Sequence, residues 1–424
     1  MQEAFLHFVW QHQAFNQKAL RLSAGEHLEV LKIGHHNHLA GPDFLESMIR
    51  IDGLQWAGSI EIHLRSSDWH KHGHSGDPNY DNVILHVVHE HDKDVLNPQQ
   101  EPLPTLELKG LIKPMLKQRY EKIITQQGTI ACGPQLINVP SITKLSMLEN
   151  ALVERLYEKS LRFKTLIEES RQDWEEATYQ WLAQGFGFKT NADSMLSLAK
   201  AVPLRVLRKH QAPLAWEALL FGAAGLLNTK PEDNYMARLQ QEFDFLQKKY
   251  GIKSALSFNQ WHFSGVRPPN FPTLRIAQLI AFVKNHSNLF GLFTNFSQVA
   301  AMKQGFEVVP GDYWLKHYRF GLAAKKPLKG MARSAQHHLL INTVAPLLMA
   351  YADYEKDGNS KEKAMSLLMS LPKEKNKITR DWVDLGWNIN SAFDSQGLIQ
   401  LYNAYCKPKR CIECKIGATL VKGS

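Results

Sequence analysis

A hairpin decides the fold of the first part of the chain, where Ser47–Leu64 reads SMIRIDGLQWAGSIEIHL. Two β-like runs, Ser47–Ile51 and Gln55–Leu64, lie on either side of Asp52 and Gly53. Both turn residues tolerate the positive φ that a two-residue hairpin turn requires. The stretch therefore predicts two antiparallel strands joined by a tight turn.

Other short apolar runs surround this hairpin. Val83–Val88 is almost continuously apolar and β-branched, which is typical of a central strand buried on both faces. Further strands are predicted at Leu28–Ile33 and Thr105–Leu108, and the first 20 residues have helical spacing. We therefore expect residues 1–135 to form an α/β or α+β domain with a mixed sheet of about five strands.

The apolar period becomes helical after Ile142. We predict that residues 136–424 form a larger all-helical domain that ends in a cysteine-rich tail. Thr273 is the expected N-cap of one of its helices. The expected helical segments are 142–161, Trp174–Leu182, Leu196–Val206, Ala215–Leu227, Tyr235–Tyr250, Thr273–Asn285, Ser334–Tyr354, Ser360–Leu371 and Ser395–Cys406.

Composition narrows the class of protein. An apolar fraction of 44% and a charged fraction of 21% are ordinary for a globular chain and exclude collagen, coiled coil and disorder. No stretch approaches 18 uninterrupted apolar residues, so no transmembrane helix is expected. The start lacks the basic and then apolar pattern of a signal peptide, which predicts a cytoplasmic protein.

Charge is divided unevenly along the chain. Residues 1–140 carry 12 Lys and Arg against 16 Asp and Glu, whereas residues 141–424 carry 38 against 25. The formal net charge of +9 therefore arises in the second part, and ten of the 19 histidines lie between His35 and His91. A basic surface attracts polyanions, so nucleic acid is the expected partner.

The hairpin also carries residues suited to metal chemistry. Asp43 precedes its first strand, and the return strand contains Glu61 and His63 at alternate positions, which point to the same face. The turn should bring this end of the return strand back beside Asp43. Two carboxylates and a basic side chain could then hold Mg²⁺ or Mn²⁺ and position water for phosphodiester attack, with Glu3 of the opening helix as a further carboxylate.

This pattern resembles the PD-(D/E)XK nuclease superfamily over roughly residues 1–110. The resemblance implies that Asp43 is the first metal ligand and Glu61 the second, and that Glu3 is the glutamate often found on the opening helix. His63 stands where the superfamily usually has lysine. A second acidic-x-basic triplet at Glu107 lacks the upstream proline and aspartate, so an ordinary edge strand explains it better.

A histidine-rich segment, Ser66–Asp77, follows the hairpin. Alternate spacing in an extended loop would place His70, His72 and His74 on one side, where they could ligate Zn²⁺ or contact a phosphate. We favour His70 and His74 over His72 for such a role. Asp77 and, from the next strand, His86 are the remaining candidates of this region and could contact the metal ligands or the substrate.

The whole chain also resembles a bacterial family defined by a domain of unknown function. The resemblance is carried by the motifs around Asp43, Glu61 and His86, by the histidine-rich segment and by the cysteine-bearing C-terminus. It implies no particular activity.

The four cysteines form a separate candidate site. Cys406, Cys411 and Cys414 have the spacing C-x4-C-x2-C, and Cys132 is the only other cysteine. A C-x2-C pair is a common half-site for Zn²⁺ or an iron–sulfur cluster, so a structural metal held by all four is one interpretation. A tail with reduced thiols is the other.

Aromatic and arginine side chains cluster around the prolines at 268–272. Trp261, Arg267, Phe271 and Arg275 could contact phosphates and stack on bases, or they could belong to the core.

The sequence therefore supports three functional hypotheses. The first is a metal-dependent phosphodiesterase or nuclease with Asp43 and Glu61 as metal ligands and His63 assisting catalysis. The second is a non-catalytic nucleic-acid-binding protein with a degenerate nuclease fold. The third is a Zn²⁺-dependent hydrolase that uses the His70–His74 loop.

Overall fold

The computed structural model describes residues 2–356 and 358–423. They form two compact units. Unit 1 comprises residues 1–150, 380–387 and 399–424, and unit 2 comprises residues 151–379 and 388–398. The expected boundary between residues 135 and 136 falls inside unit 1, and the cysteine-bearing C-terminal segment belongs to that same unit.

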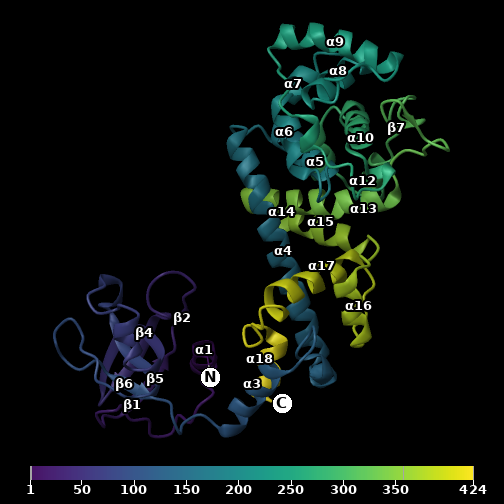
Figure 1. Cartoon of the computed structure of the whole chain (residues 1–424). Helices are drawn as coiled ribbons and strands as arrows, with labels where there is room; N and C mark the ends of the chain where they lie inside the picture. Colours follow the sequence, from purple (N-terminus) through teal and green to yellow (C-terminus); the bar gives the residue numbers. More distant parts are fainter. Residues whose placement is uncertain (1, 357, 424) are drawn as a thin grey trace. The chain divides into compact units, whose positions relative to one another are not determined.

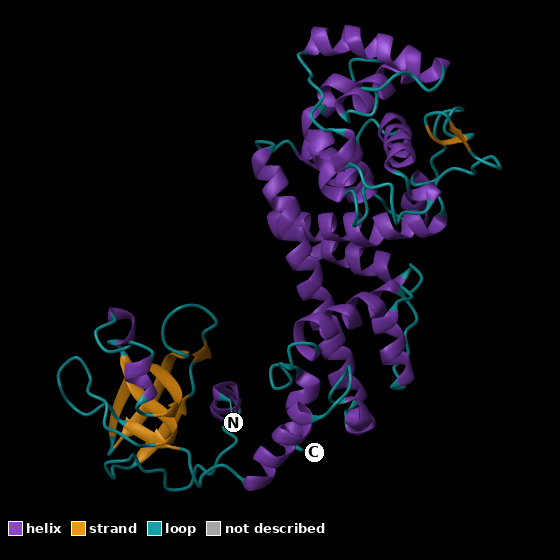
Figure 2. Cartoon of the chain, in the orientation of Figure 1, coloured by secondary structure: helices purple, strands orange, loops and turns teal. Residues whose placement is uncertain are grey.

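A mixed sheet forms the centre of unit 1, as the sequence predicted (Figure 2, orange). Its strands lie in the order β1-β3-β4-β5-β6, and β2 pairs with β3. The β1–β3, β2–β3 and β3–β4 pairs are antiparallel, whereas β4–β5 and β5–β6 are parallel. The strands are β1 (Leu28–Lys32), β2 (His35–His36), β3 (Phe44–Ile51), β4 (Leu54–Arg65), β5 (Val83–Glu90) and β6 (Thr105–Glu107).

The β3–β4 hairpin turns where expected. Asp52 and Gly53 have φ of 44° and 88°, so both occupy the left-handed region that a tight two-residue turn requires. Val83–Val88 lies buried in β5, between β4 and β6, which confirms a central strand. Glu107 lies on β6 at the edge of the sheet, as the ordinary reading of the second triplet predicted.

Alternation along β4 separates the core from the polar residues. Ile60 and Ile62 join an apolar cluster with Phe5 and Val9 of α1 (Glu3–Gln11). Glu61 and His63 alternate with these isoleucines and therefore point to the opposite face. The same alternation in β5 buries Leu85 and Val87 in that cluster and turns His86 toward the face of Glu61 and His63.

The remaining helices of unit 1 are short, apart from α4. The opening helix ends at Gln11 rather than near residue 20, because Gln13 adopts a left-handed φ of 47° and interrupts the helical path. Sequence periodicity did not predict α3 or α18. The other helical segments of the unit are α2 (Asp68–Lys71), η1 (Pro78–Tyr80), α3 (Pro114–Thr125), η2 (Gly133–Asn138), η6 (Leu401–Cys406), α18 (Lys415–Lys422) and parts of α4 (Ser141–Glu169) and α16 (Lys377–Asp384).

Unit 2 is helical around a large aromatic and aliphatic core, and the colours of Figure 1 follow the chain into its helices. It also contains a small hairpin, β7 (His317–Arg319) and β8 (Leu322–Ala323), which the all-helical expectation missed. Its helical segments are α5 (Trp174–Phe186), α6 (Ala192–Ala201), α7 (Leu204–Leu207), α8 (Pro213–Ala223), α9 (Asn234–Tyr250), η3 (Phe258–Gln260), η4 (Pro268–Asn270), α10 (Pro272–Asn285), α11 (Leu289–Thr294), α12 (Val299–Gly305), α13 (Arg333–Leu339), η5 (Leu340–Val344), α14 (Ala345–Glu355), α15 (Gly358–Met369) and α17 (Ala392–Gln400).

Two details of the expected helices were wrong. Pro203 divides the predicted helix Leu196–Val206 into α6 and α7, because proline cannot donate the backbone hydrogen bond of a helix interior. Thr273 is not an N-cap: Pro272 occupies the first helical position, and the Thr273 hydroxyl donates to the carbonyl of Tyr318.

Within the described residues, none of the helices combines the length and the apolar character needed to cross a membrane.

Candidate metal centre

Asp43 and Glu61 lie side by side where β3 and β4 meet. The backbone N–H of Asp43 donates to Glu61 Oε2 at 3.1 Å, and the N–H of Ile62 donates to Asp43 Oδ2 at 2.9 Å. These reciprocal bonds follow from the hairpin register, in which Phe44 pairs with Ile60. Each carboxylate is therefore fixed by the backbone of the strand that carries the other.

Burial makes it energetically unfavourable for Asp43 and Glu61 to be ionised together unless a cation is bound. Glu61 is only 5% exposed, and burial together with the charge of Asp43 raises its pKa to about 9. Burial also raises the pKa of Glu3, and Asp43 adds to that effect. A bound cation would relieve both causes, because it would supply positive charge where two or three carboxylates meet.

His7 joins the carboxylates from α1, one helical turn after Glu3. Its Nε2 lies 3.2 Å from Asp43 Oδ2, yet this buried nitrogen makes no hydrogen bond among the described residues. The sequence analysis missed His7, although its i,i+4 spacing from Glu3 places both residues on one face of a helix.

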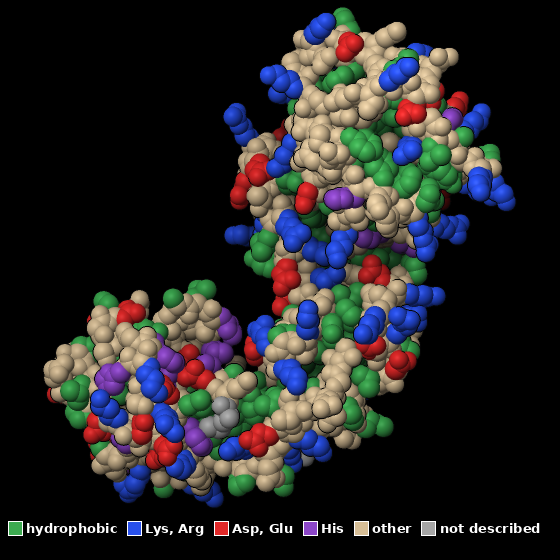
Figure 3. Space-filling view, in the orientation of Figure 1, with side chains coloured by type: hydrophobic (Ala, Val, Ile, Leu, Met, Phe, Trp, Pro, Cys, Tyr) green, Lys and Arg blue, Asp and Glu red, His purple; other side chains and the backbone are tan. Residues whose placement is uncertain are grey.

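Three histidines meet next to Glu61. The ligand atoms of His63, His72 and His74 all lie within 4.8 Å of one another. His63 Nε2 is 3.1 Å from His72 Nδ1, and Glu61 Oε1 is 3.1 Å from His74 Nε2 and 3.5 Å from His63 Nε2. Histidine side chains also gather beside acidic ones on the face of unit 1 that Figure 3 shows.

His86 holds His63 from the neighbouring strand. Its Nε2 lies 2.8 Å from His63 Nδ1, and both rings are almost completely buried. Burial, followed by the neighbouring imidazoles, lowers the pKa of His63 to about 2, and burial lowers the pKa of His86 to about 3. Both rings are therefore neutral at physiological pH, and neutral imidazole is the form that ligates metal.

The histidine-rich segment is not extended as predicted. Asp68–Lys71 form one helical turn, α2, which directs His70 away from the cluster, where its Nδ1 lies 3.1 Å from the hydroxyl of Ser75. His72 instead reaches His63. Asp77 accepts a hydrogen bond from the N–H of Asn79 and so caps η1.

Tyr80 and Trp69 enclose the cluster, and the sequence analysis assigned neither of them. The Tyr80 ring stacks on His74 with centroids 3.8 Å apart, and the Trp69 ring meets His74 and His86 edge-on. Burial raises the pKa of Tyr80 to about 12, so its hydroxyl stays protonated. These rings restrict water on one side of the histidines.

The donor set fits a first-row divalent ion. Metal–ligand bonds of about 2.0–2.2 Å place neighbouring ligand atoms roughly 3–3.5 Å apart, which matches the separations of His63 from His72 and of Glu61 from His74 and His63. The buried Nε2 of His74 lies 3.1 Å from Glu61 Oε1 but makes no well-aligned hydrogen bond among the described residues, which suits two atoms that could ligate the same ion. Imidazole with carboxylate suits Zn²⁺ or Mn²⁺ better than Mg²⁺.

Other predicted contacts lie elsewhere. Arg275 is 3% exposed, bonds to Gln278 and Asn270, and has its guanidinium 4.3 Å from the ring centroid of Phe188. Trp261 is 4% exposed and donates to the carbonyl of Ala224. These two side chains belong to the core of unit 2 and are not available to nucleic acid.

The four cysteines come together in unit 1, where all of them line one small cavity.

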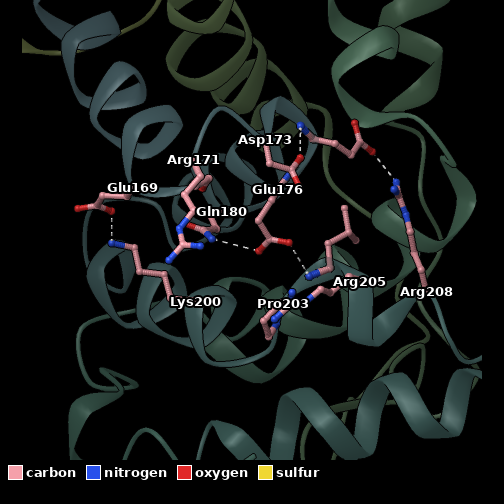
Figure 4. Close-up of a pocket in the computed structure, with 12 residues that line it drawn as sticks. Glu169, Arg171, Asp173, Glu176, Gln180, Lys200, Pro203, Arg205 and Arg208 are labelled. Atoms are coloured by element: carbon pink, nitrogen blue, oxygen red, sulfur yellow. Dashed lines mark hydrogen bonds and ion pairs between the residues drawn. The ribbon is translucent and has the colours of Figure 1, made fainter. Parts of the chain in front are cut away.

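A pocket of about 700 Å³ in unit 2 contains none of the predicted site residues (Figure 4). Most of its charged groups have structural partners. Lys200 pairs with Glu169 at 2.6 Å, Asp173 caps α5, and Glu176 accepts hydrogen bonds from Gln180 and from the N–H of Leu204. We therefore assign the candidate site to the sheet of unit 1 and not to this pocket.

The chain belongs to the family described as "Protein of unknown function (DUF2851)", which matches residues 3–377. The matched range includes all residues of the candidate metal centre and Cys132, and it ends before the other three cysteines. No curated protein and no solved structure matches the chain.

Proposed function

We propose that this protein is a metal-dependent hydrolase that cleaves phosphodiester bonds in nucleic acid. Mn²⁺ or Zn²⁺ would be held by His63, His72, His74 and Glu61, with Asp43 beside them. The observation that carries the proposal is the convergence of three imidazoles and a buried carboxylate on one face of β4. Structural roles alone do not explain it, because burying the Glu61 carboxylate and the His63 imidazole together is unfavourable without a cation.

Each residue has a distinct task in this proposal. His86 keeps the proton of His63 on Nδ1, which leaves Nε2 free to ligate. Asp43 is more exposed than Glu61, with 22% of its side chain accessible against 6%, and so can accept a proton from an attacking water. A bound ion would supply charge neutralisation at the phosphate and would activate that water.

Two further observations support a nucleic-acid substrate. The order of Asp43, tight hairpin, Glu61 and His63, followed by a buried neighbouring strand, agrees with the resemblance to PD-(D/E)XK nucleases. The excess of Lys and Arg in residues 141–424 favours a polyanionic partner.

Metal content and cleavage test the proposal together. The purified protein should retain about one Mn²⁺ or Zn²⁺ and should nick supercoiled DNA or cut single-stranded RNA when that ion is supplied. Glu61→Gln and His72→Ala should weaken metal binding and cleavage at least about tenfold. His70→Ala is the matched control, because His70 belongs to the same segment but lies outside the cluster.

Two results would replace this proposal. Salt-sensitive DNA binding without cleavage under any of the metals would indicate a non-catalytic binding protein, because phosphate contacts release counterions. Zinc that is lost in His72→Ala, with hydrolysis of a small carboxylic ester but not of a phosphodiester, would indicate a Zn²⁺-dependent hydrolase of another bond.

A further inference from the structure

Two distant segments of unit 1 bring four cysteines to one place. Cys132 precedes η2, Cys406 ends η6, and Cys414 is the residue before α18, with Cys411 in the loop between the last two. All four line the same small cavity, together with Ala131, Tyr405 and Gly417. Cys132 and Cys406, which are 274 positions apart in the chain, thus line the same cavity.

The thiols are enclosed and unoxidised. None of the four forms a disulfide, and Cys132, Cys411 and Cys414 are 8%, 8% and 6% exposed. Burial raises the pKa of Cys132 to about 12 and that of Cys411 to about 11, and each is raised further by neighbouring cysteines. Four thiolates could share this cavity only around a compensating positive charge.

The backbone is arranged to support a thiolate. Burial raises the pKa of the Cys414 thiol, and the backbone N–H groups of Ile416 and Gly417, at the start of α18, act against that effect and favour the thiolate. A Cβ atom on Gly417 would lie 2.0 Å from the carbonyl oxygen of Cys411, so only glycine permits α18 to pack this closely against the cysteine loop. Lys409, whose charge favours the ionised form of Cys411, follows Cys406 by three residues.

Spacing distinguishes a cluster from a single ion. Tetrahedral Zn–S bonds of about 2.3 Å would place the sulfurs about 3.8 Å apart. Among the residues that the structure describes, the histidines His63, His72 and His74 form a group whose ligand atoms lie within 4.8 Å of one another, and the four cysteines do not form such a group. Four cysteines around one cavity supply one thiolate for each iron of a [4Fe–4S] cluster, whose core is larger than a single ion.

We propose that Cys132, Cys406, Cys411 and Cys414 hold a [4Fe–4S] cluster. Each thiol releases its proton to solvent as its sulfur bonds to one iron, and the iron and sulfide come from an external donor of cluster components. The cluster fastens the C-terminal segment to η2, against which α18 packs. This site is separate from the histidine centre and does not depend on its function.

Elemental analysis of anaerobically purified full-length protein tests the proposal. We expect about four iron and about four acid-labile sulfide per chain, with visible charge-transfer absorption that bleaches on reduction. Protein that has lost iron during purification should regain it on reconstitution with ferrous iron and sulfide. Cys411→Ser and Cys132→Ser should each lose most of the iron.

Two controls separate the cysteines from their surroundings. Glu413 lies between Cys411 and Cys414, and its side chain is exposed and pairs with Arg410. The variant Glu413→Gln should therefore keep its iron. His72→Ala should also keep its iron while losing the ion of the histidine centre. Should a serine variant fail to fold, Cys406→Ser, at a less buried position, provides the same comparison.

Zinc instead of iron at a molar ratio near one, lost in Cys411→Ser, would overturn the cluster in favour of a single ion. Four freely titrating thiols in reconstituted, folded protein that contains neither metal would overturn the site altogether.

Discussion

At the scale of residues, the sequence predicted the strand-borne part of the centre better than the loop-borne part. Asp43, Glu61 and His63 follow from hairpin register and from the two-residue period of a strand, both of which are local rules. His7 comes from a separate helix, and Tyr80 from a 3₁₀ turn, so their contacts with the site depend on tertiary packing. The spacing of the histidines did not predict the helical turn α2. Because of this turn, His72 contacts His63, whereas His70 points away from the cluster.

His86 offers a direct test of how the histidine centre is supported. His86→Ala should weaken Mn²⁺ or Zn²⁺ binding about 10–100-fold, because His63 would lose the partner that fixes its ring and tautomer. Isothermal titration with each metal measures the change. His89→Ala is the control on the same strand, since His89 points to the opposite face. Equal losses in both variants would show that the strand, and not the imidazole contact, is what matters.

Lys159 in unit 2 gives a pH-dependent prediction. Burial first, and then Arg155 and Arg162, lower its pKa from 10.5 to about 7, against the opposing effect of Glu374, while its Nζ donates to Asn342 Oδ1. The pKa is lower in the folded state, so between pH 7 and pH 10.5 the unfolded chain binds more protons. The free energy of unfolding contributed by this group must therefore rise with pH in that window.

The variant Lys159→Met removes the ionisable group, so comparing it with the wild type measures the pH-dependent contribution of Lys159 to the free energy of unfolding. The variant should be more stable than the wild type at pH 7, and its advantage should shrink by about 1–2 kcal/mol by pH 9. Urea denaturation of both proteins at the two pH values measures the difference. An advantage that stays constant between the two pH values would mean that Lys159 keeps its proton throughout.

At the scale of elements, periodicity located the sheet and most long helices, and it failed where a single residue changes the backbone path. Gln13 ends α1 early, Pro203 divides α6 from α7, and Pro272 takes the helix start expected for Thr273. Short elements such as β2 and the β7–β8 hairpin bury too few residues to leave a periodic signal. The hairpin was predictable because its turn residues determine both register and strand order.

Substitutions in the Asp52–Gly53 turn should therefore change the stability of the protein. Gly53→Ala should lower the free energy of unfolding by about 1 kcal/mol, because an L side chain is disfavoured at φ 88°. Gly53→Asn should cost less, since asparagine tolerates the left-handed region. Chemical denaturation followed by circular dichroism compares the three proteins. Identical losses for alanine and asparagine would argue that backbone conformation is not the cause.

At the scale of the whole molecule, each compact unit is built from separate stretches of the chain. Unit 1 takes its sheet from the first 110 residues and part of its core from residues beyond 399. Local sequence rules predicted a basic helical part and an acidic, histidine-rich part. Apart from the interpretation in which Cys132 shares a metal with the C-terminal cysteines, they did not predict that the C-terminal segment returns to the sheet unit, because its contacts join residues almost 300 positions apart, such as Lys409 and the carbonyl of Ile124.

The C-terminal segment should accordingly stabilise unit 1 although it contributes nothing to the histidine centre. Ile412 and Val421 are buried in the same apolar cluster as Phe5 and Ile62. Removing residues 399–424 would expose that cluster and should cost unit 1 several kcal/mol, at about 1.5–3 kcal/mol for each large buried side chain. Val421→Ala should cost about 1–3 kcal/mol by itself, and exposed Lys422→Ala should cost little. Hydrogen exchange of β4 and β5 measures this loss, with helices α8 and α10 of unit 2 as the internal reference. Unchanged protection of the strands after truncation would mean that the sheet unit is complete without its returning C-terminus.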